Sequence, residues 1–201
     1  MNDKFFDLKK EKQDRMINAA LKIFALNGYA HASTDDIVKE AGISKGLLFH
    51  YFSNKIGLYS FVFDYAVKYV SLEVTSSVDK NDNDFFGLHI QIKNIESMIM
   101  RGYPYMIAFL NRTQNEDVLE AINAIMEKRD VVPELIEELF KHANSASLRS
   151  DVDIAKINKM IDIISKGILS DNIGNVEDHP EYYAIQMKEY LLMLKSMSYK
   201  A

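Results

Sequence analysis

The sequence predicts an all-α protein: an N-terminal three-helix helix-turn-helix head plus a C-terminal helical body, about nine helices in all. Apolar residues recur at the i, i+3, i+4, i+7 spacing of helices, and the strict alternation of a half-buried strand is missing. Three prolines and eight glycines among 201 residues leave little room for flexible linkers. We therefore divide the chain into a helix-turn-helix domain, 1–54, and a helical domain for ligand binding and dimerisation, 55–201.

The N-terminal part predicts three helices before a longer fourth. The first runs from about Leu8 to Asn27, with Gly28 suited to a left-handed cap beyond its end. The second begins at Ser33-Thr34, whose hydroxyls can cap free N–H groups, and closes at Gly42. Ser44 caps the third, which reaches about Tyr51. Asn54 then caps a fourth helix that reaches about Ser77.

The remainder predicts five further helices. Helices are expected from about Asp84, around 104–111, and from 115 to 142 with a bend near Pro133, which cannot donate a backbone hydrogen bond. The last two helices are expected near 153–170 and 180–197. The final helix opens with Pro180 at its first position and is apolar on more than one side. One side packs on the body, and the other needs a partner chain.

Composition narrows the class of protein. There is no cysteine, which excludes a disulfide framework and a thiolate zinc site and fits a cytoplasmic protein. No apolar run approaches the roughly 20 residues of a membrane span, and the N-terminus lacks the apolar stretch of a signal peptide. We expect neither secretion nor membrane insertion.

Charge is unevenly distributed along the chain. The net charge is −5, yet residues 1–60 hold nine of the 24 Lys and Arg and seven of the 29 Asp and Glu, an excess of two positive charges. The rest therefore carries 15 basic against 22 acidic residues. This excess is small, and a solvated helix face explains it as well as a nucleic-acid surface does.

Two short helices joined by a tight turn at Gly42 form the pattern of a helix-turn-helix, whose second helix fits a DNA major groove. Leu48 and Phe52 are four residues apart and form the buried stripe of that second helix. A tight turn in an all-helical protein also has a purely structural explanation. The pattern by itself leaves both interpretations open.

The residues that carry the pattern resemble a known family. The stretch "RMINAALKIFALNGYAHASTDDIVKEAGISKGLLFHYFSNKIGLY" is similar to the DNA-binding domain of the tetracycline-repressor (TetR) family of bacterial transcriptional regulators. The similarity covers about a quarter of the chain and rests on "AAxxxFxxxGY", on "TxxxIxxxAGxSKGxLxxYF" and on Lys55. It implies a regulator of transcription, a repressor released from a pseudo-palindromic operator by a small molecule.

The resemblance also implies roles for individual residues. Hydroxyls and ammonium groups would hold phosphates, Gly46 would approach the DNA, and three side chains would face the groove. The DNA-binding residues are therefore predicted to be Thr34, Ser44, Lys45, Gly46, Leu47, Phe49, His50, Tyr51 and Lys55. Leu47 and Phe49 replace the more polar residues common in the family, so His50 is the better candidate for a base-edge bond.

The predicted partners are a double-stranded DNA operator, a small-molecule effector and a second copy of the chain, with no membrane. Aromatic and methionine side chains suit an adaptable apolar site for an apolar or amphipathic molecule. Its expected contacts are His89, Tyr103, Tyr105, Met106 and Phe109. The family dimerises through its last two helices, and the expected seam comprises Ile157, Ile161, Ile164, Ile168, Tyr182, Ile185 and Leu192.

Three other classes of protein were weighed against this prediction. No metal-spaced ligand set, cysteine nucleophile or phosphate-binding loop points to an enzyme, and no cofactor or metal is expected. A helical small-molecule-binding module that has lost specific DNA binding is the alternative, opposed by the intact Ser44-Lys45-Gly46 and Lys55. A peripheral membrane protein is disfavoured because the body is acidic and its last helix lacks a basic face.

Overall fold

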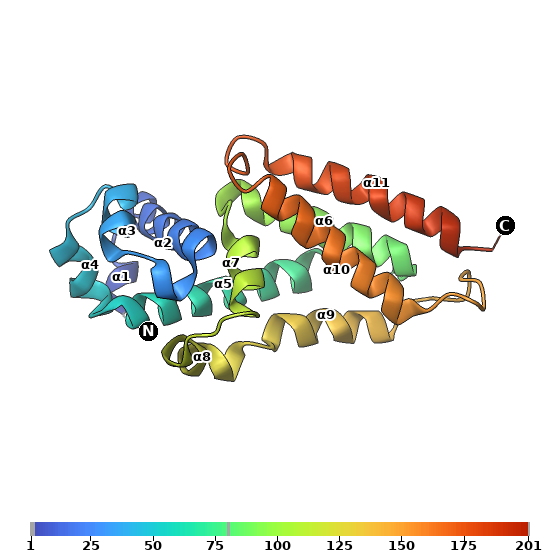
Figure 1. Ribbon diagram of the computed structural model, residues 1–201, viewed down its shortest axis with the longest axis horizontal. Coiled ribbons are helices and arrows are strands. Elements are labelled where there is room, and N and C mark those ends of the chain that lie inside the picture. Colours follow the sequence, from blue (N-terminus) through green and yellow to red (C-terminus); the bar gives the residue numbers. More distant parts are fainter. Residues whose placement is uncertain (1–2, 80, 201) are drawn as a thin grey trace. The chain divides into compact units, whose positions relative to one another are not determined.

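The computed structural model describes residues 3–79 and 81–200, and those residues contain eleven α-helices and no strand (Figure 1). The chain divides into two compact units. The first comprises residues 1–69 and 103–131, and the second comprises residues 70–102 and 132–201. The division into 1–54 and 55–201 concerns function and stays a prediction. No helix among the described residues has the length and apolarity needed to cross a membrane.

The first unit contains α1 (Asp3–Phe6), α2 (Lys10–His31), α3 (Thr34–Ala41), α4 (Lys45–Phe52) and the first two thirds of α5 (Lys55–Ser77). It also contains α7 (Met106–Thr113), α8 (Leu119–Ile125) and the short 3₁₀ helix η1 (Met126–Lys128). Helix α2 packs on both α3 and α7. The core of the first unit is aromatic, with Phe24, Tyr59 and Phe109 in mutual ring contact.

The second unit contains the end of α5, α6 (Phe85–Gly102), α9 (Val131–Lys141) from its second residue on, α10 (Ile154–Asp171) and α11 (Pro180–Ser198). Helix α11 packs along α6, and α10 lies beside α11 (Figure 1). Burial of one stripe of each helix explains the pairing: Ile92 and Ile95 of α6 are buried, as are Met187 and Leu191 of α11.

Several helix ends have capping residues at the expected positions, although α2 continues to His31, beyond the predicted end near Asn27. Ser33 accepts a hydrogen bond from the N–H of Asp35, and Asp153 accepts one from the N–H of Lys156. Pro180 is the first residue of α11, where its missing N–H costs nothing. Gly28 has the predicted positive φ, 68°, but its ψ of 175° places it in an extended region open almost only to glycine.

Two features of the helix pattern differ from prediction. The single helix expected over 115–142 is wrong, because α8 and η1 end before α9 begins at Val131. Pro133 lies in the first turn of α9, where no preceding carbonyl needs its N–H, so it causes no bend. Helix α1 was not expected. These two differences raise the count from about nine helices to eleven.

Candidate nucleic-acid interface

The turn between α3 and α4 has the geometry that a helix-turn-helix requires. Gly42 adopts the left-handed conformation, with φ 63° and ψ 42°. The N–H of Ile43 donates to the carbonyl of Val38 at 3.0 Å, which closes the end of α3. Ser44 then accepts a hydrogen bond from the N–H of Leu47 at 3.2 Å and starts α4. The chain therefore passes from α3 to α4 through a turn of only three residues.

Helix α4 has one buried side and one open side. Leu48 and Phe52 are buried, as the sequence predicts. Three residues of the predicted DNA set are exposed on α4, namely Lys45, Gly46 and His50, and Leu47, Phe49 and Tyr51 are half-buried. A side chain at Gly46 would meet no atom within 4 Å, so the backbone there is open to a close approach. Ser44 is exposed and Thr34 is half-buried.

The two predicted phosphate-binding lysines already have partners in the unbound protein. The Lys45 ammonium lies 2.8 Å from Oδ1 of Asp35, and both side chains are at least half exposed. The Lys55 ammonium lies 4.5 Å from the centre of the Tyr29 ring and donates to the carbonyl of Ala30 at 3.4 Å. An exposed ion pair is weak, and therefore Asp35 does not prevent Lys45 from reaching a phosphate.

Helix α1 packs against α4. The sequence did not predict this contact. The Phe5 ring is fully buried against Tyr51, Phe52 and Phe61, at centroid distances of 5.8, 5.2 and 4.9 Å. The buried Gln13 side chain donates to the carbonyls of Phe6 and Leu8 and fixes the segment. The adjacent phenylalanines near the N-terminus were the available signal, because an apolar pair among charged residues needs a core to cover it.

The residues expected to contact an effector are all buried, and they divide between the two units. Tyr103, Tyr105, Met106 and Phe109 belong to the first unit, and His89 belongs to the second. The Tyr103 hydroxyl donates to Asp14 of α2 at 2.9 Å and is 2.5 Å from the Tyr65 hydroxyl. These contacts make Tyr103 part of the packing of the first unit, and its role toward an effector stays a prediction.

His89 is enclosed within the second unit. Its Nε2 is 3.0 Å from the amide oxygen of Asn158, and its ring packs on Phe85 and Phe140. Burial, assisted by the positive charge of Lys93, lowers the pKa of His89 to about 4. The imidazole is therefore neutral at physiological pH.

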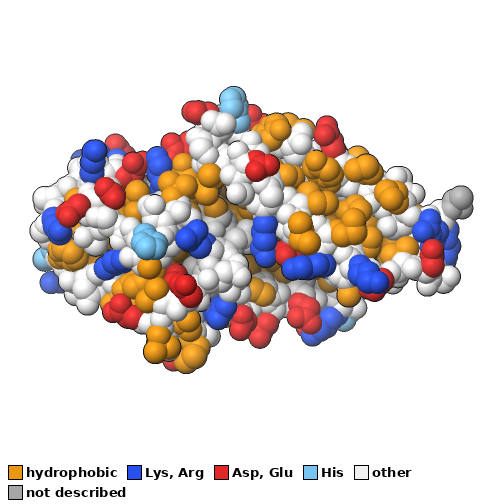
Figure 2. All heavy atoms as spheres, viewed as in Figure 1, with side chains coloured by type: hydrophobic (Ala, Val, Ile, Leu, Met, Phe, Trp, Pro, Cys, Tyr) orange, Lys and Arg blue, Asp and Glu red, His pale blue; other side chains and the backbone are white. Residues whose placement is uncertain are grey.

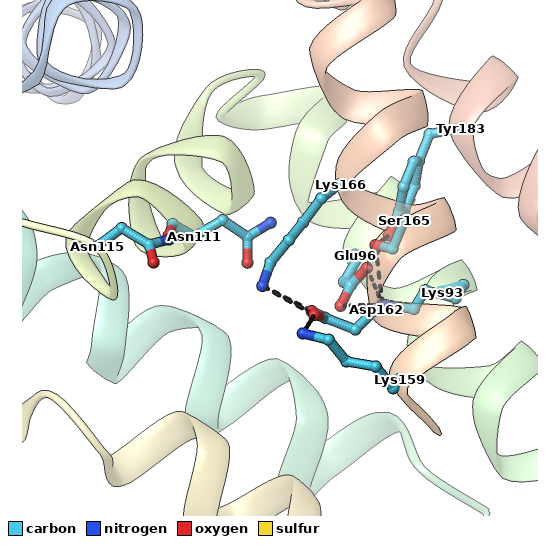
Figure 3. Close-up of polar contacts among 9 residues, drawn as sticks. All are labelled: Lys93, Glu96, Asn111, Asn115, Lys159, Asp162, Ser165, Lys166 and Tyr183. Atoms are coloured by element: carbon cyan, nitrogen blue, oxygen red, sulfur yellow. Dashed lines mark hydrogen bonds and ion pairs between the residues drawn. The ribbon is translucent and has the colours of Figure 1, made fainter. Parts of the chain in front are cut away.

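A buried polar network joins three helices of the second unit, and sequence reasoning missed it (Figure 3). The Lys93 ammonium is 2.9 Å from Glu96 Oε1, and these α6 side chains are only 14% and 12% exposed. The Tyr183 hydroxyl of α11 donates to Glu96 and lies 2.7 Å from the Ser165 hydroxyl of α10. Burial, followed by the Glu96 charge, raises the pKa of Tyr183. The network satisfies its buried charges internally and aligns α10 and α11 on α6.

Helices α10 and α11 carry an apolar surface on the side away from this network. Figure 2 shows hydrophobic side chains gathered over the two helices. Tyr182, Ile185 and Leu192 are exposed, with 43%, 52% and 48% of their surface accessible. Ile157, Ile164 and Ile168 of the expected seam are half-buried, whereas Ile161 is buried inside the protomer. Further exposed apolar residues on these helices, outside the expected set, are Ile154, Met160, Ile163, Tyr190, Met193 and Met197.

Comparison with known proteins agrees with this geometry. Residues 16–60 match the family model of bacterial regulatory proteins, tetR family, a segment that runs from α2 into α5. The HTH-type transcriptional regulator YxaF of Bacillus subtilis is 30% identical over 88 residues, which are 43% of this chain and 46% of that protein. The fatty acid metabolism regulator protein of B. subtilis is 38% identical over 47 residues, 23% of this chain and 24% of that protein. These matches span less than half of each relative's length.

A solved structure extends the similarity to the whole fold. The TetR-family transcriptional regulator of Chloroflexus aurantiacus has a TM-score of 0.66 and 18% identity, covering 99% of this chain and 98% of that one. At this identity the likeness concerns the fold. Residues 16–60 therefore resemble the DNA-binding segment of bacterial regulatory proteins of the tetR family, and the fold as a whole resembles that of a TetR-family regulator.

Proposed function

We propose that the chain is a DNA-binding transcriptional regulator, a repressor that leaves a pseudo-palindromic operator when a small molecule binds. The observation that carries the proposal is α4, which follows a left-handed glycine, buries Leu48 and Phe52, and exposes Lys45, Gly46 and His50. A short helix with one open polar side can enter a major groove while its first turn meets the backbone. The matched family segment supports the same interpretation.

The phosphate contacts proposed here come from groups around α4. Ser44 and Thr34 lie at helix N-termini, where hydroxyl and backbone N–H groups favour an anion. Lys45 and Lys55 add positive charge, and Tyr51 adds a phenolic hydroxyl. Base reading falls to His50, because Leu47 and Phe49 offer apolar contact only.

Selection of bound fragments from genomic DNA by the purified protein tests the proposal. We expect a recovered site with two half-sites, about 34 to 36 Å apart, because a dimer presents two recognition helices. Lys45→Ala should weaken binding on every sequence and lower the salt slope by about one ion. Lys68→Ala, an exposed lysine of α5, is the matched control and should change neither quantity. Failure to recover any site would favour the alternative, a binding module without specific DNA recognition.

We also propose a homodimer formed through the exposed apolar side of α10 and α11. Several large apolar side chains exposed together are unusual on a monomer and mark an association surface. Two copies are needed to read a pseudo-palindromic site, so dimerisation and the operator geometry depend on each other.

The effector is proposed to be apolar or amphipathic, in keeping with the methionine and aromatic content of residues 103–109. Because one relative is named a fatty acid metabolism regulator protein, a long-chain fatty acid is the first probe. Coupling of about 1 to 3 kcal/mol would shift operator affinity roughly 5- to 150-fold. An effector must weaken operator binding, and operator must weaken effector binding by the same factor. A probe that raises the melting temperature of the protein but leaves operator affinity unchanged binds the protein without being its effector.

A further inference from the structure

Tyr29 holds the lysine that is proposed to bind a DNA phosphate. The Lys55 ammonium lies 4.5 Å from the centre of the Tyr29 ring, within the range of a cation–π contact. The same ammonium donates to the carbonyl of Ala30, the residue after Tyr29. Lys55 is the first residue of α5, whereas Tyr29 follows the kink in α2. The position of the ammonium is therefore set by α2.

Tyr29 is itself held by two carboxylates of the α7–α8 segment, which here means the connection between the two helices and the first turn of α8: Glu116 lies in the connection and Glu120 in that first turn. Its hydroxyl donates to Glu120 at 2.6 Å, and its backbone N–H donates to Glu116 at 3.4 Å. Glu116 also accepts a hydrogen bond from the Tyr59 hydroxyl at 3.3 Å. Burial and the Glu120 charge raise the pKa of the Tyr29 hydroxyl, so it remains a donor at neutral pH.

The backbone before Tyr29 gives the ring little freedom to move. Gly28 has a φ of 68°, and a Cβ at this position would lie 2.8 Å from the guanidinium of Arg112 in α7. The backbone conformation favours glycine, and a larger residue would also require the Arg112 guanidinium to shift. The Tyr29 ring contacts the rings of Phe24 and Tyr59 and lies under the Lys55 ammonium. Tyr29 is 6% exposed.

We propose that Tyr29 is a positioning residue for DNA binding, which holds Lys55 for its phosphate contact and transmits the position of the α7–α8 segment to it. The proposal rests on the proposed function, because it gives Tyr29 a role only through Lys55. A displacement of Glu116 and Glu120 would reach the DNA contact through one aromatic side chain. The partner of Lys45, Asp35, instead belongs to α3.

The geometry can be tested without DNA. The ε-methylene protons of Lys55 should resonate upfield of ordinary lysines in the free protein, because they lie over an aromatic face. Tyr29→Leu should remove that shift, and Tyr29→Phe should keep it. Tyr59→Phe is the matched control, since it deletes a hydroxyl bonded to Glu116 but leaves the Lys55 contact intact. An unshifted Lys55 in the wild-type protein would overturn the proposal.

The functional role is tested by a double-mutant cycle on operator binding. Lys55→Met should weaken binding and reduce the salt slope by up to about one ion. Tyr29→Leu should weaken binding about two- to fivefold, and Lys55→Met should cost nothing further when added to it. A general loss of stability would instead leave the two effects additive. Additive losses, with the folded state verified by circular dichroism, would overturn the proposal.

Two outcomes separate this inference from the proposed function. If the wild-type protein bound no DNA while Lys55 still showed its ring-current shift, the proposed DNA-binding function would be refuted. The contact between Lys55 and Tyr29 would then have a structural role only. If the protein bound DNA but Lys55→Met left affinity and salt slope unchanged, Lys55 would not be a phosphate contact. The second result would refute the role of Tyr29 while leaving the regulator intact.

Discussion

The Lys45 ammonium lies 2.8 Å from Oδ1 of Asp35, so the first residue of the recognition helix is paired with the second residue of the preceding helix. In the proposed complex, Lys45 exchanges this carboxylate for a DNA phosphate. We predict that Asp35→Asn strengthens operator binding about two- to fivefold, because it removes an exposed ion pair and a charge that repels phosphates. Titration of labelled operator at fixed salt measures the change.

Asp36→Asn is the matched control for this prediction. It removes the same charge one residue further along α3, where the structure gives no pairing with Lys45. Its effect should be smaller than that of Asp35→Asn. Equal gains from the two variants would mean that net charge, and not the release of Lys45, sets the affinity.

A second prediction concerns His50, an exposed polar side chain on α4 that we propose contacts a base edge. His50→Ala should relax the preference at one base position of each half-site by about 1 to 3 kcal/mol. The salt slope should stay close to the wild-type value, in contrast to Lys45→Ala. Binding to a panel of single-base operator variants measures this. Losses of equal size on cognate and scrambled duplexes would assign His50 to the backbone instead.

A third prediction separates the two sides of α11. Leu192 is 48% exposed and Leu191 is fully buried, although the residues are adjacent. Leu192→Glu should give a folded monomer, because the charge meets only the partner's apolar surface. Leu191→Glu should unfold the second unit, because a carboxylate would be buried without a partner. Light scattering and circular dichroism distinguish the outcomes, and a wild-type monomer at micromolar concentration would contradict the dimer.

Local chemistry explains why so many helix ends could be predicted from the sequence. Ser33 and Ser44 cap helices through their own side chains, and Gly42 adopts a conformation that other residues resist. Each signal lies within a few residues of the feature that it predicts. The same holds for the buried stripe of α4, because residues four apart share one face of a helix.

The features that escaped prediction depend on residues distant in the chain. Helix α1 has only four residues and no periodicity, and it is held by the packing of Phe5 on Phe52 and Phe61. The break before α9 is accompanied by hydrogen bonds between Gln114 and Arg129, fifteen residues apart. Periodicity alone cannot reveal such contacts, so the 115–142 segment gave the pattern of one helix.

The candidate site shows the same division. The roles of the α4 residues could be predicted one by one because the family motif fixes their spacing, and these roles stay predictions. The partners of Lys45 and Lys55 could not be predicted from the sequence. Tyr29 and Lys55, for example, are brought together only by the fold. The two carboxylates that hold Tyr29 lie about ninety residues from it and carry no local signal.

The last prediction concerns pH and the buried His89. Its pKa is lowered to about 4 by burial and by Lys93, against an unfolded value near 6.5. As the pH falls below 6.5, His89 therefore takes up a proton in the unfolded chain but stays neutral in the folded chain. The stability tied to the neutral imidazole is complete above pH 6.5 and is lost progressively toward pH 4, by about 3 kcal/mol at most.

Urea unfolding at fixed protein concentration, carried out between pH 7.5 and 4, measures this loss. His89→Phe should flatten the curve in this window, because it replaces the imidazole with a ring that suits Phe85 and Phe140 and does not titrate. His142→Ala is the control, since that histidine is exposed and should leave the curve unchanged. If His89→Phe kept the full wild-type decline, the acid sensitivity would come from other groups, and the neutral buried state of His89 would be refuted as its cause.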